Sequence, residues 1–138
     1  MRLNPYLNFD GQCAEAFAFY ARCLNGQNLA IQTFAQSPMA DQVGPEGRDK
    51  VIHARMNVGD TVLMGSDSPS SGSSAAKGFA VSLSVDSAEE AERVFHDMAD
   101  GGQIQMPIGE TFWAVRFGMF TDRFGIPWMV NYERPAAA

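Results

Sequence analysis

Few side chains in this sequence have the chemistry of a general base or a metal ligand. The 138 residues include two histidines and two cysteines. His53 lies in the segment "VIHARMN", where Arg55 and Asn57 follow at alternate positions, so the three side chains would share one face of a strand. An imidazole in such a polar group can act as a general base, anchor a ligand or bind a metal. His53 is therefore the candidate catalytic residue, and a half-exposed strand histidine is the alternative.

The remaining metal-binding and nucleophilic side chains give fewer indications of a site. An alternative metal set would combine His53 with Asp67 or Glu110. Cys13 and Cys23 fall in one predicted helix, whose rise separates them by roughly 15 Å, which is beyond the reach of a disulfide. No histidine accompanies either cysteine in a recognisable motif, so we expect both to be reduced core thiols.

A tryptophan near the end of the sequence is a candidate ligand contact. Trp113 and Arg116 would lie on opposite faces of their strand, so at most one of them readily lines a cavity. We prefer Trp113, because an indole offers an aromatic surface and one hydrogen-bond donor to a small molecule. The alternative is a core tryptophan. Arg116 is expected to pair with an acidic side chain instead.

The composition limits the classes of partner. Ten Lys and Arg against sixteen Asp and Glu give a net charge of −6, and no basic cluster is present that would neutralise phosphates or anionic lipid. We therefore expect no nucleic acid and no membrane among the partners. The first ten residues lack the long apolar core of a secretion signal, so a cytoplasmic location is expected.

Periodicity and turn residues predict two helices and eight strands. One helix carries its apolar stripe from Cys13 to Leu24 and ends at an "NG" pair, and the other begins after Ser87, which forms a capping box with Glu90. The strands are expected at residues 3–9, 29–34, 51–58, 61–65, 79–85, 103–108, 113–120 and 126–132. Residues 37–49 are expected to form a mobile loop.

The order of these elements indicates a duplication. The motif "LNFD" at 7–10 parallels "LSVD" at 83–86, and the "VGDTVLM" hairpin parallels "DRFGIPWM". We predict one α+β domain, 1–138, made of two βαβββ modules at about 1–66 and 78–134 with a Ser-rich linker at 67–77. One helix covers only one face of a four-stranded sheet, so two modules are expected to form a curved mixed sheet around a small-molecule cleft.

The segment "DRFGIPWMVNY" is predicted to be a turn that leads into the last strand. Asp122 would accept hydrogen bonds from backbone donors, and Gly125 would take a positive φ. Alternation then divides the strand: one face carries Trp128, Val130 and Tyr132, and the other carries Pro127, Met129 and Asn131. Proline is expected at the start of this strand or on an unpaired edge.

The chain resembles the vicinal oxygen chelate superfamily, which includes glyoxalases, bleomycin resistance proteins and dioxygenases, and within it the PhnB-like group often labelled 3-demethylubiquinone 3-methyltransferase. The resemblance rests on "YLNFDGQCAEAFAFY" at 6–20, "VGDTVLMGSD" at 58–67, "EEAERVF" at 89–95 and "MPIGETFWAVRFGMFTDRFGIPWMVN" at 106–131. It implies four metal positions, approximately Pro5, Met64, Ala80 and Met129. None of these side chains suits a hard or borderline cation, so no metal and no other cofactor is expected.

The resemblance also implies a homodimer, since family members often complete the cleft with modules from two chains. We expect a protein that holds a small organic ligand in an apolar cleft, either as a metal-independent enzyme or as a sequestering protein. The expected ligand contacts are Arg55, Met64, Trp113, Met129 and Asn131. The alternatives are a metal-dependent lyase or dioxygenase with atypical ligands, and a structural interaction module. Methyltransferase activity is not expected, because the glycine-rich turn that usually binds S-adenosylmethionine is missing.

Overall fold

The structure is a computed structural model that describes residues 1–68 and 76–135. The chain divides into two compact units, Met1–Ser74 and Ala75–Ala138. Residues 69–75 of the predicted Ser-rich linker lie outside the described residues.

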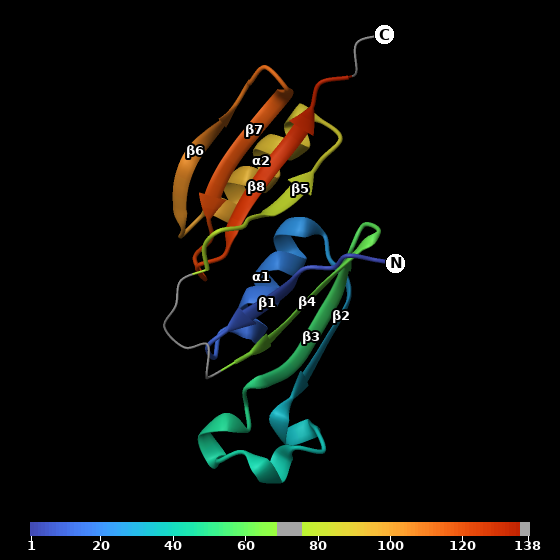
Figure 1. Cartoon of the computed structure of the whole chain (residues 1–138), viewed down its shortest axis with the longest axis vertical. Coiled ribbons are helices and arrows are strands. Elements are labelled where there is room, and N and C mark those ends of the chain that lie inside the picture. The colour runs from blue at the N-terminus through green and yellow to red at the C-terminus, as the bar shows by residue number, and fades with distance from the viewer. Residues whose placement is uncertain (69–75, 136–138) are drawn as a thin grey trace. The chain divides into compact units, whose positions relative to one another are not determined.

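The first unit is one four-stranded mixed sheet with a helix on one face. Its elements in chain order are β1 (Tyr6–Phe9), α1 (Cys13–Leu24), β2 (Gln27–Thr33), β3 (Val51–Val58) and β4 (Thr61–Asp67). The strand order is β1-β4-β3-β2, and β1 runs parallel to β4 while the other pairs are antiparallel. Three short 3-10 helices, Phe34–Gln36, Ala40–Gln42 and Pro45–Gly47, connect β2 to β3 (Figure 1).

The second unit repeats this topology. Its elements are β5 (Val81–Ser84), α2 (Ala88–Ala99), β6 (Gln103–Gly109), β7 (Ala114–Thr121) and β8 (Pro127–Glu133). The strand order β5-β8-β7-β6, with β5 parallel to β8, matches the first sheet strand for strand (Figure 1). The predicted α+β class and the two βαβββ modules are confirmed.

The structure moves several predicted boundaries. The first strand begins at Tyr6, directly after Pro5, because proline has no backbone N–H to give to a sheet. The second strand begins earlier than expected, at Gln27, and includes a register shift before Ala30 where Asn28 takes φ 56°. A β-bulge of this kind interrupts alternation, which concealed the start of the strand in the sequence.

A helix aromatic packs over a strand glycine in each unit. A Cβ built on Gly65 of β4 would lie 2.7 Å from Cε1 of Phe17, and one built on Gly118 of β7 would lie 2.5 Å from Cε2 of Phe95. Both rings are buried, so neither can move aside easily. The glycines therefore set how closely each helix approaches its sheet.

The turn before β8 is organised by one buried carboxylate, as predicted. Asp122 accepts hydrogen bonds from the backbone N–H of Phe124 at 2.8 Å and of Ile126 at 3.0 Å. Its second oxygen accepts from Nε1 of the buried Trp128 at 2.8 Å. Gly125 has φ 89°, a conformation in which a side chain would be strained. Asp122 thus fixes the turn and also satisfies the polar atom of the largest core residue of this unit.

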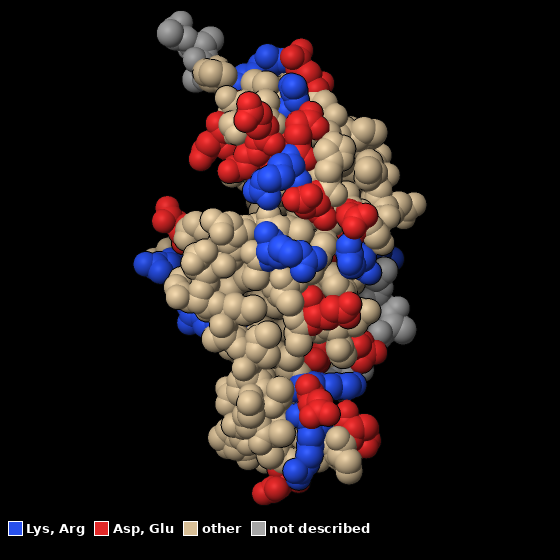
Figure 2. Space-filling view, turned by 180° about the vertical axis from the view of Figure 1, so that it is seen from behind, with Lys and Arg blue, Asp and Glu red and all other residues tan. Residues whose placement is uncertain are grey.

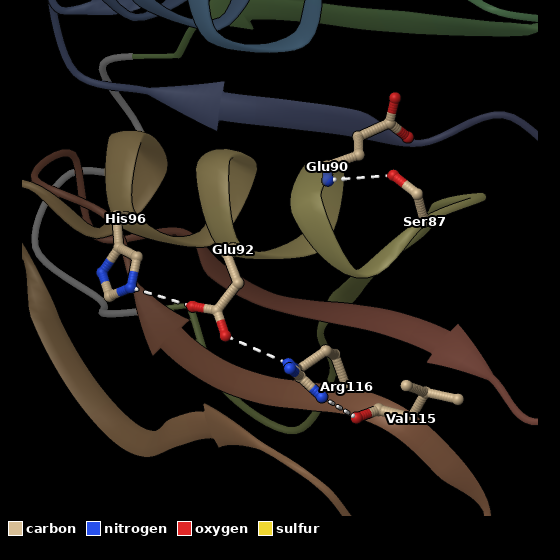
Figure 3. Close-up of polar contacts among 6 residues, drawn as sticks. All are labelled: Ser87, Glu90, Glu92, His96, Val115 and Arg116. Carbon is tan, nitrogen blue, oxygen red and sulfur yellow. Dashed lines mark hydrogen bonds and ion pairs between the residues drawn. The ribbon is translucent and has the colours of Figure 1, made fainter.

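The start of α2 carries only half of the predicted capping box. The hydroxyl of Ser87 accepts a hydrogen bond from the backbone N–H of Glu90 at 3.1 Å. This is the contact drawn between the two residues in Figure 3, and the Glu90 carboxylate makes no return hydrogen bond to the Ser87 backbone. A serine at this position still satisfies one of the backbone donors that a helix leaves free at its N-terminus.

A second buried carboxylate, Asp67, ties the end of β4 to two other segments of the first unit. One oxygen accepts from the backbone N–H of Gly11 at 2.8 Å and of Cys13 at 3.0 Å, and the other accepts from Val51 at 2.8 Å. Cys13 and Cys23 are buried free thiols in the same helix, as expected. Burial, with a further contribution from the negative charge of Asp67, raises the pKa of Cys13 from 9.0 to about 12.

The packing of Phe95 on Gly118 generates a first prediction. Gly118→Ala places a methyl group against the Phe95 ring and the Ile108 backbone, so the free energy of unfolding should fall by about 1–3 kcal/mol in urea titration. Gly109→Ala is the matched control in the same sheet, because nothing closer than 4.0 Å would meet its Cβ. Equal unfolding midpoints for the two variants would contradict this account of the helix contact.

The raised pKa of Cys13 generates a second prediction. At pH 8 a thiol with a pKa of about 12 is ionised in roughly one molecule in ten thousand, so Cys13 should resist alkylation by iodoacetamide in the folded protein. Because the folded-state pKa lies above the ordinary value, this group's contribution to stability is full below pH 9 and is lost as the pH rises toward 12. Mass spectrometry should show rapid labelling of Cys13 only in denaturant. Rapid labelling without denaturant would refute the inert-thiol interpretation.

Candidate functional site

The face of the first sheet away from α1, called here the first open face, is polar. Alternation puts the buried Leu7, Ala54 and Leu63 toward α1, and the residues between them toward the opposite side. The residues of the first open face are Tyr6, Asn8, Ala30, Gln32, His53, Arg55, Asn57, Val62, Met64 and Ser66. All ten are exposed or half-buried.

Arg55 and Met64, two of the predicted ligand contacts, lie next to each other on this first open face. The register places Arg55 opposite Met64 on one side and Ala30 on the other, while Tyr6 lies on the far side of Met64. The rings of Tyr6 and His53 are tilted, with centroids 6.0 Å apart. Arg55 has no ion pair within the described part of the chain. The predicted polar group of His53, Arg55 and Asn57 therefore exists as a half-exposed surface.

The alternative metal set of His53 with Asp67 does not assemble. Asp67 follows Leu63 and Gly65 at every second position, so its side chain points to the same helix-facing side as theirs. His53 lies on the opposite side of the sheet. Both of its oxygens already accept backbone hydrogen bonds. Glu110, the other member considered, belongs to the second unit and pairs with Arg134 at 3.1 Å. Within residues 1–68 and 76–135, no three His, Cys, Asp or Glu side chains are grouped so that they could hold a metal ion.

The face of the second sheet away from α2, called the second open face, is rich in methionine and aromatic side chains. Met106 of β6 lies opposite Met119 of β7, which lies opposite Met129 of β8. These three residues form a methionine row across three neighbouring strands. Phe117 follows on β7, and the Trp113 ring lies over it at a centroid distance of 5.1 Å. Sequence reasoning found Met129 and Trp113 but missed Met106 and Met119, which only the strand register connects.

Asn131 is the polar group beside this apolar surface. It lies opposite Phe117 of β7 and Ser84 of β5. Its Oδ1 atom is buried and has no hydrogen-bond partner among the described protein atoms, while its amide nitrogen has only a 3.5 Å contact to Glu133. Buried amide oxygens are nearly always paired in proteins, either with protein groups or with ordered water, so this one is free to accept a hydrogen bond from a water or a ligand donor. The second open face thus combines apolar lining with one fixed acceptor.

Trp113 and Arg116 lie on opposite faces of the second sheet, as predicted. Arg116 points toward α2, where its Nε donates to Glu92 at 3.1 Å and its Nη1 donates to the carbonyl of Val115 at 2.8 Å. Glu92 also contacts His96 one turn along the helix (Figure 3). These contacts use Arg116 as a structural bridge between helix and strand, so the expected acidic partner is confirmed.

The four metal positions implied by the family resemblance do not offer the usual donors. Pro5 and Ala80 precede β1 and β5, and the residues that lie opposite Met64 and Met129 are Tyr6 and Ser82. A phenol, a hydroxyl and two thioethers are poor ligands for Zn²⁺, Mn²⁺ or Fe²⁺, which prefer imidazole and carboxylate. These residues therefore do not fit the divalent cation.

Solved structures show how widely this architecture occurs. Protein PA1353 from Pseudomonas aeruginosa has a TM-score of 0.87 and 48% sequence identity, with 98% of this chain and 99% of that chain covered. A protein from Bacillus cereus described as a putative 3-demethylubiquinone-9 3-methyltransferase, PhnB protein, has a TM-score of 0.80 and 25% identity, with 96% of this chain and 99% of that chain covered.

No helix among the described residues is long and apolar enough to cross a membrane.

Sequence comparison agrees with the fold. Protein YjdN of Escherichia coli K12 is 37% identical over 139 residues, which covers 95% of each chain. The family model described as Glyoxalase/Bleomycin resistance protein/Dioxygenase superfamily matches residues 2–130. The duplicated βαβββ units, the shared strand order and this match over nearly the whole length lead to one conclusion: the chain belongs to the glyoxalase/bleomycin resistance protein/dioxygenase superfamily.

Proposed function

We propose that this chain binds a small organic molecule through the second open face, without a divalent metal. The observation that carries the proposal is the buried, unpaired Oδ1 of Asn131 beside the methionine row. Small-molecule sites commonly have a largely apolar lining with a few fixed polar groups that orient the ligand. The ligand supplies an N–H or O–H donor to Asn131 and lays an apolar part against Met119 and Met129.

The side chains of this face suit an aromatic or otherwise flat ligand. Methionine is unbranched and polarisable, so a row of three adapts to different shapes and makes favourable contacts with aromatic rings. Trp113, 41% exposed and packed edge-on against Phe117, extends the apolar surface and brings an indole donor. Trp113, Met129 and Asn131 were predicted ligand contacts, and in this proposal they act together. Arg55 and Met64, the other two, belong to the first open face and stay predictions.

Asn131→Leu tests this proposal, because it keeps the size of the side chain and removes the acceptor. A panel of small neutral aromatic amides and phenols is titrated into protein carrying 13C-methyl methionine. Compounds that bind should shift the methyl resonances of Met119 and Met129, and Asn131→Leu should weaken their binding about tenfold, as expected for a buried hydrogen bond. The unliganded variant should unfold at the same or a higher temperature, since a buried unpaired polar atom has been removed.

Asn8→Leu is the control, because Asn8 is an exposed asparagine on the first open face. It should leave the affinity of every compound unchanged. A panel that shifts neither Met119 nor Met129, or equal binding by the Asn131→Leu variant, would remove the support for this site.

A metal-dependent lyase or dioxygenase with atypical ligands is the second candidate function, and elemental analysis separates it from the first. Protein purified without chelators should contain much less than one Ni, Zn, Fe or Mn per chain, because the donor set does not suit these ions. A stoichiometric metal would overturn the metal-free proposal. Under either candidate, His53 stays the predicted catalytic residue, and an unchanged turnover in His53→Ala would exclude it from the chemistry.

We also propose a cytoplasmic homodimer. Support for self-association comes from the sheet edges: among the described residues, β1, β2, β5 and β6 are edge strands, and Ile104 and Met106 of β6 are exposed. An exposed edge strand with apolar side chains is a template for pairing with another chain. The two buried free thiols accord with a reducing compartment. Light scattering that gives the mass of one chain would exclude the dimer.

A further inference from the structure

Arg55 stands out among the cations of this acidic protein because it is exposed on a surface without acids. The net charge is −6, yet none of the ten residues of the first open face is Asp or Glu. Six of the other nine Lys and Arg residues form ion pairs in the described part of the chain: Arg48, Lys50, Arg93, Arg116, Arg123 and Arg134. Arg22 lies over the Phe19 ring, and Arg2 and Lys77, like Arg55, form no ion pair among the described residues. On the face shown in Figure 2, many Lys and Arg side chains lie beside Asp or Glu. Arg55 is therefore a cation placed where no carboxylate of the same sheet face neutralises it.

Met64 and Ala30 lie directly opposite Arg55, and hydrogen-bond donors lie along its strand and diagonally across from it. His53 precedes it by two positions on β3, so both side chains leave the sheet on the same side. By continuation of the register in which Ala54 lies opposite Gly65, Ser66 comes next to His53. The Tyr6 ring contacts the His53 ring from β1. Directly opposite side chains on one sheet face, such as those of His53 and Ser66, have Cβ atoms about 5 Å apart. Diagonal neighbours such as Arg55 and Ser66 are about 7–8 Å apart, a distance that the long arginine side chain can span.

We propose that the first open face binds a tetrahedral oxyanion, the phosphate or phosphonate group of a small molecule, with Arg55 as the principal contact. A guanidinium offers two parallel N–H donors to two oxygens of such a group. The imidazole of His53 and the hydroxyl of Ser66 are the donors for the third oxygen. A carboxylate has only two oxygens and would leave these additional donors unused, so the arrangement favours phosphate over carboxylate.

This inference goes beyond the binding proposed for the second open face and does not depend on it. The two faces belong to different sheets, and Arg55 and Asn131 can be changed separately. Loss of phosphate binding in an Arg55 variant leaves the methionine row and Asn131 intact. Failure of one proposal therefore says nothing against the other.

The test is a titration of the whole chain with inorganic phosphate at constant ionic strength, followed by 1H–15N NMR. Binding should cause saturable shifts of the Arg55 side-chain Nε–H signal and of the Arg55 and Ser66 backbone amides. Arg55→Ala should weaken the affinity at least tenfold, and Arg55→Gln, which keeps much of the length but not the charge, should weaken it similarly. Arg55→Lys should lower the phosphate affinity several-fold, because a point charge replaces a bidentate donor.

Arg48→Ala is the matched control, since it removes one exposed cation from the same unit and changes the net charge equally. Its phosphate affinity should equal that of the parent chain. Shifts that do not saturate, or an equal loss of phosphate affinity in the Arg48 and Arg55 variants, would indicate non-specific electrostatic attraction. Either result would contradict a binding site at Arg55. Acetate that binds as tightly as phosphate at the same ionic strength would overturn the choice of a tetrahedral oxyanion.

Discussion

Each sheet of this protein has a single helix, and the rest of the structure depends on that constraint. A four-stranded sheet has two faces, and the period of two along its strands sends alternate side chains to each. The helix covers one face, where the aromatic rings of Phe17 and Phe95 pack over glycines. The helix does not cover the other face. The same constraint therefore creates both the cores and the surfaces on which function is proposed.

The two modules use one backbone plan to present different chemistry. Met64 and Met129 occupy corresponding positions on the last strands of the two sheets. The residue opposite Met64 on β3 is Arg55, whereas the residue opposite Met129 on β7 is Met119. Next to the same two methionines, the parallel strands supply Tyr6 in one sheet and Ser82 in the other. A duplicated scaffold has thus kept its hydrogen-bonded framework and given one face a cation and the other a methionine row.

The sequence was informative wherever a local rule governs the backbone. Short-range chemistry accounts for three of the confirmed predictions. They are the turn at Asp122 and Gly125, the duplicated order of elements, and the opposite faces of Trp113 and Arg116. The methionine row was missed because Met106 and Met119 meet only through the pairing of β6 with β7, which includes register shifts. Asp67 was considered as a metal ligand because no pattern in the sequence shows that three distant backbone donors converge on it.

Asp67, Asp122 and Asn131 each place a side-chain oxygen out of contact with solvent, and their hydrogen bonds differ. Asp67 and Asp122 have both oxygens occupied by protein donors, so their burial stabilises the fold and leaves nothing for a ligand. Asn131 has a buried oxygen without such a donor, which lowers the stability of the unliganded chain. A leucine at position 131 would avoid the free-energy cost of a buried, unpaired polar atom. Positions where a sequence departs from the locally most stable choice tend to be functional, and on this ground we propose the unpaired amide of Asn131 as a ligand contact.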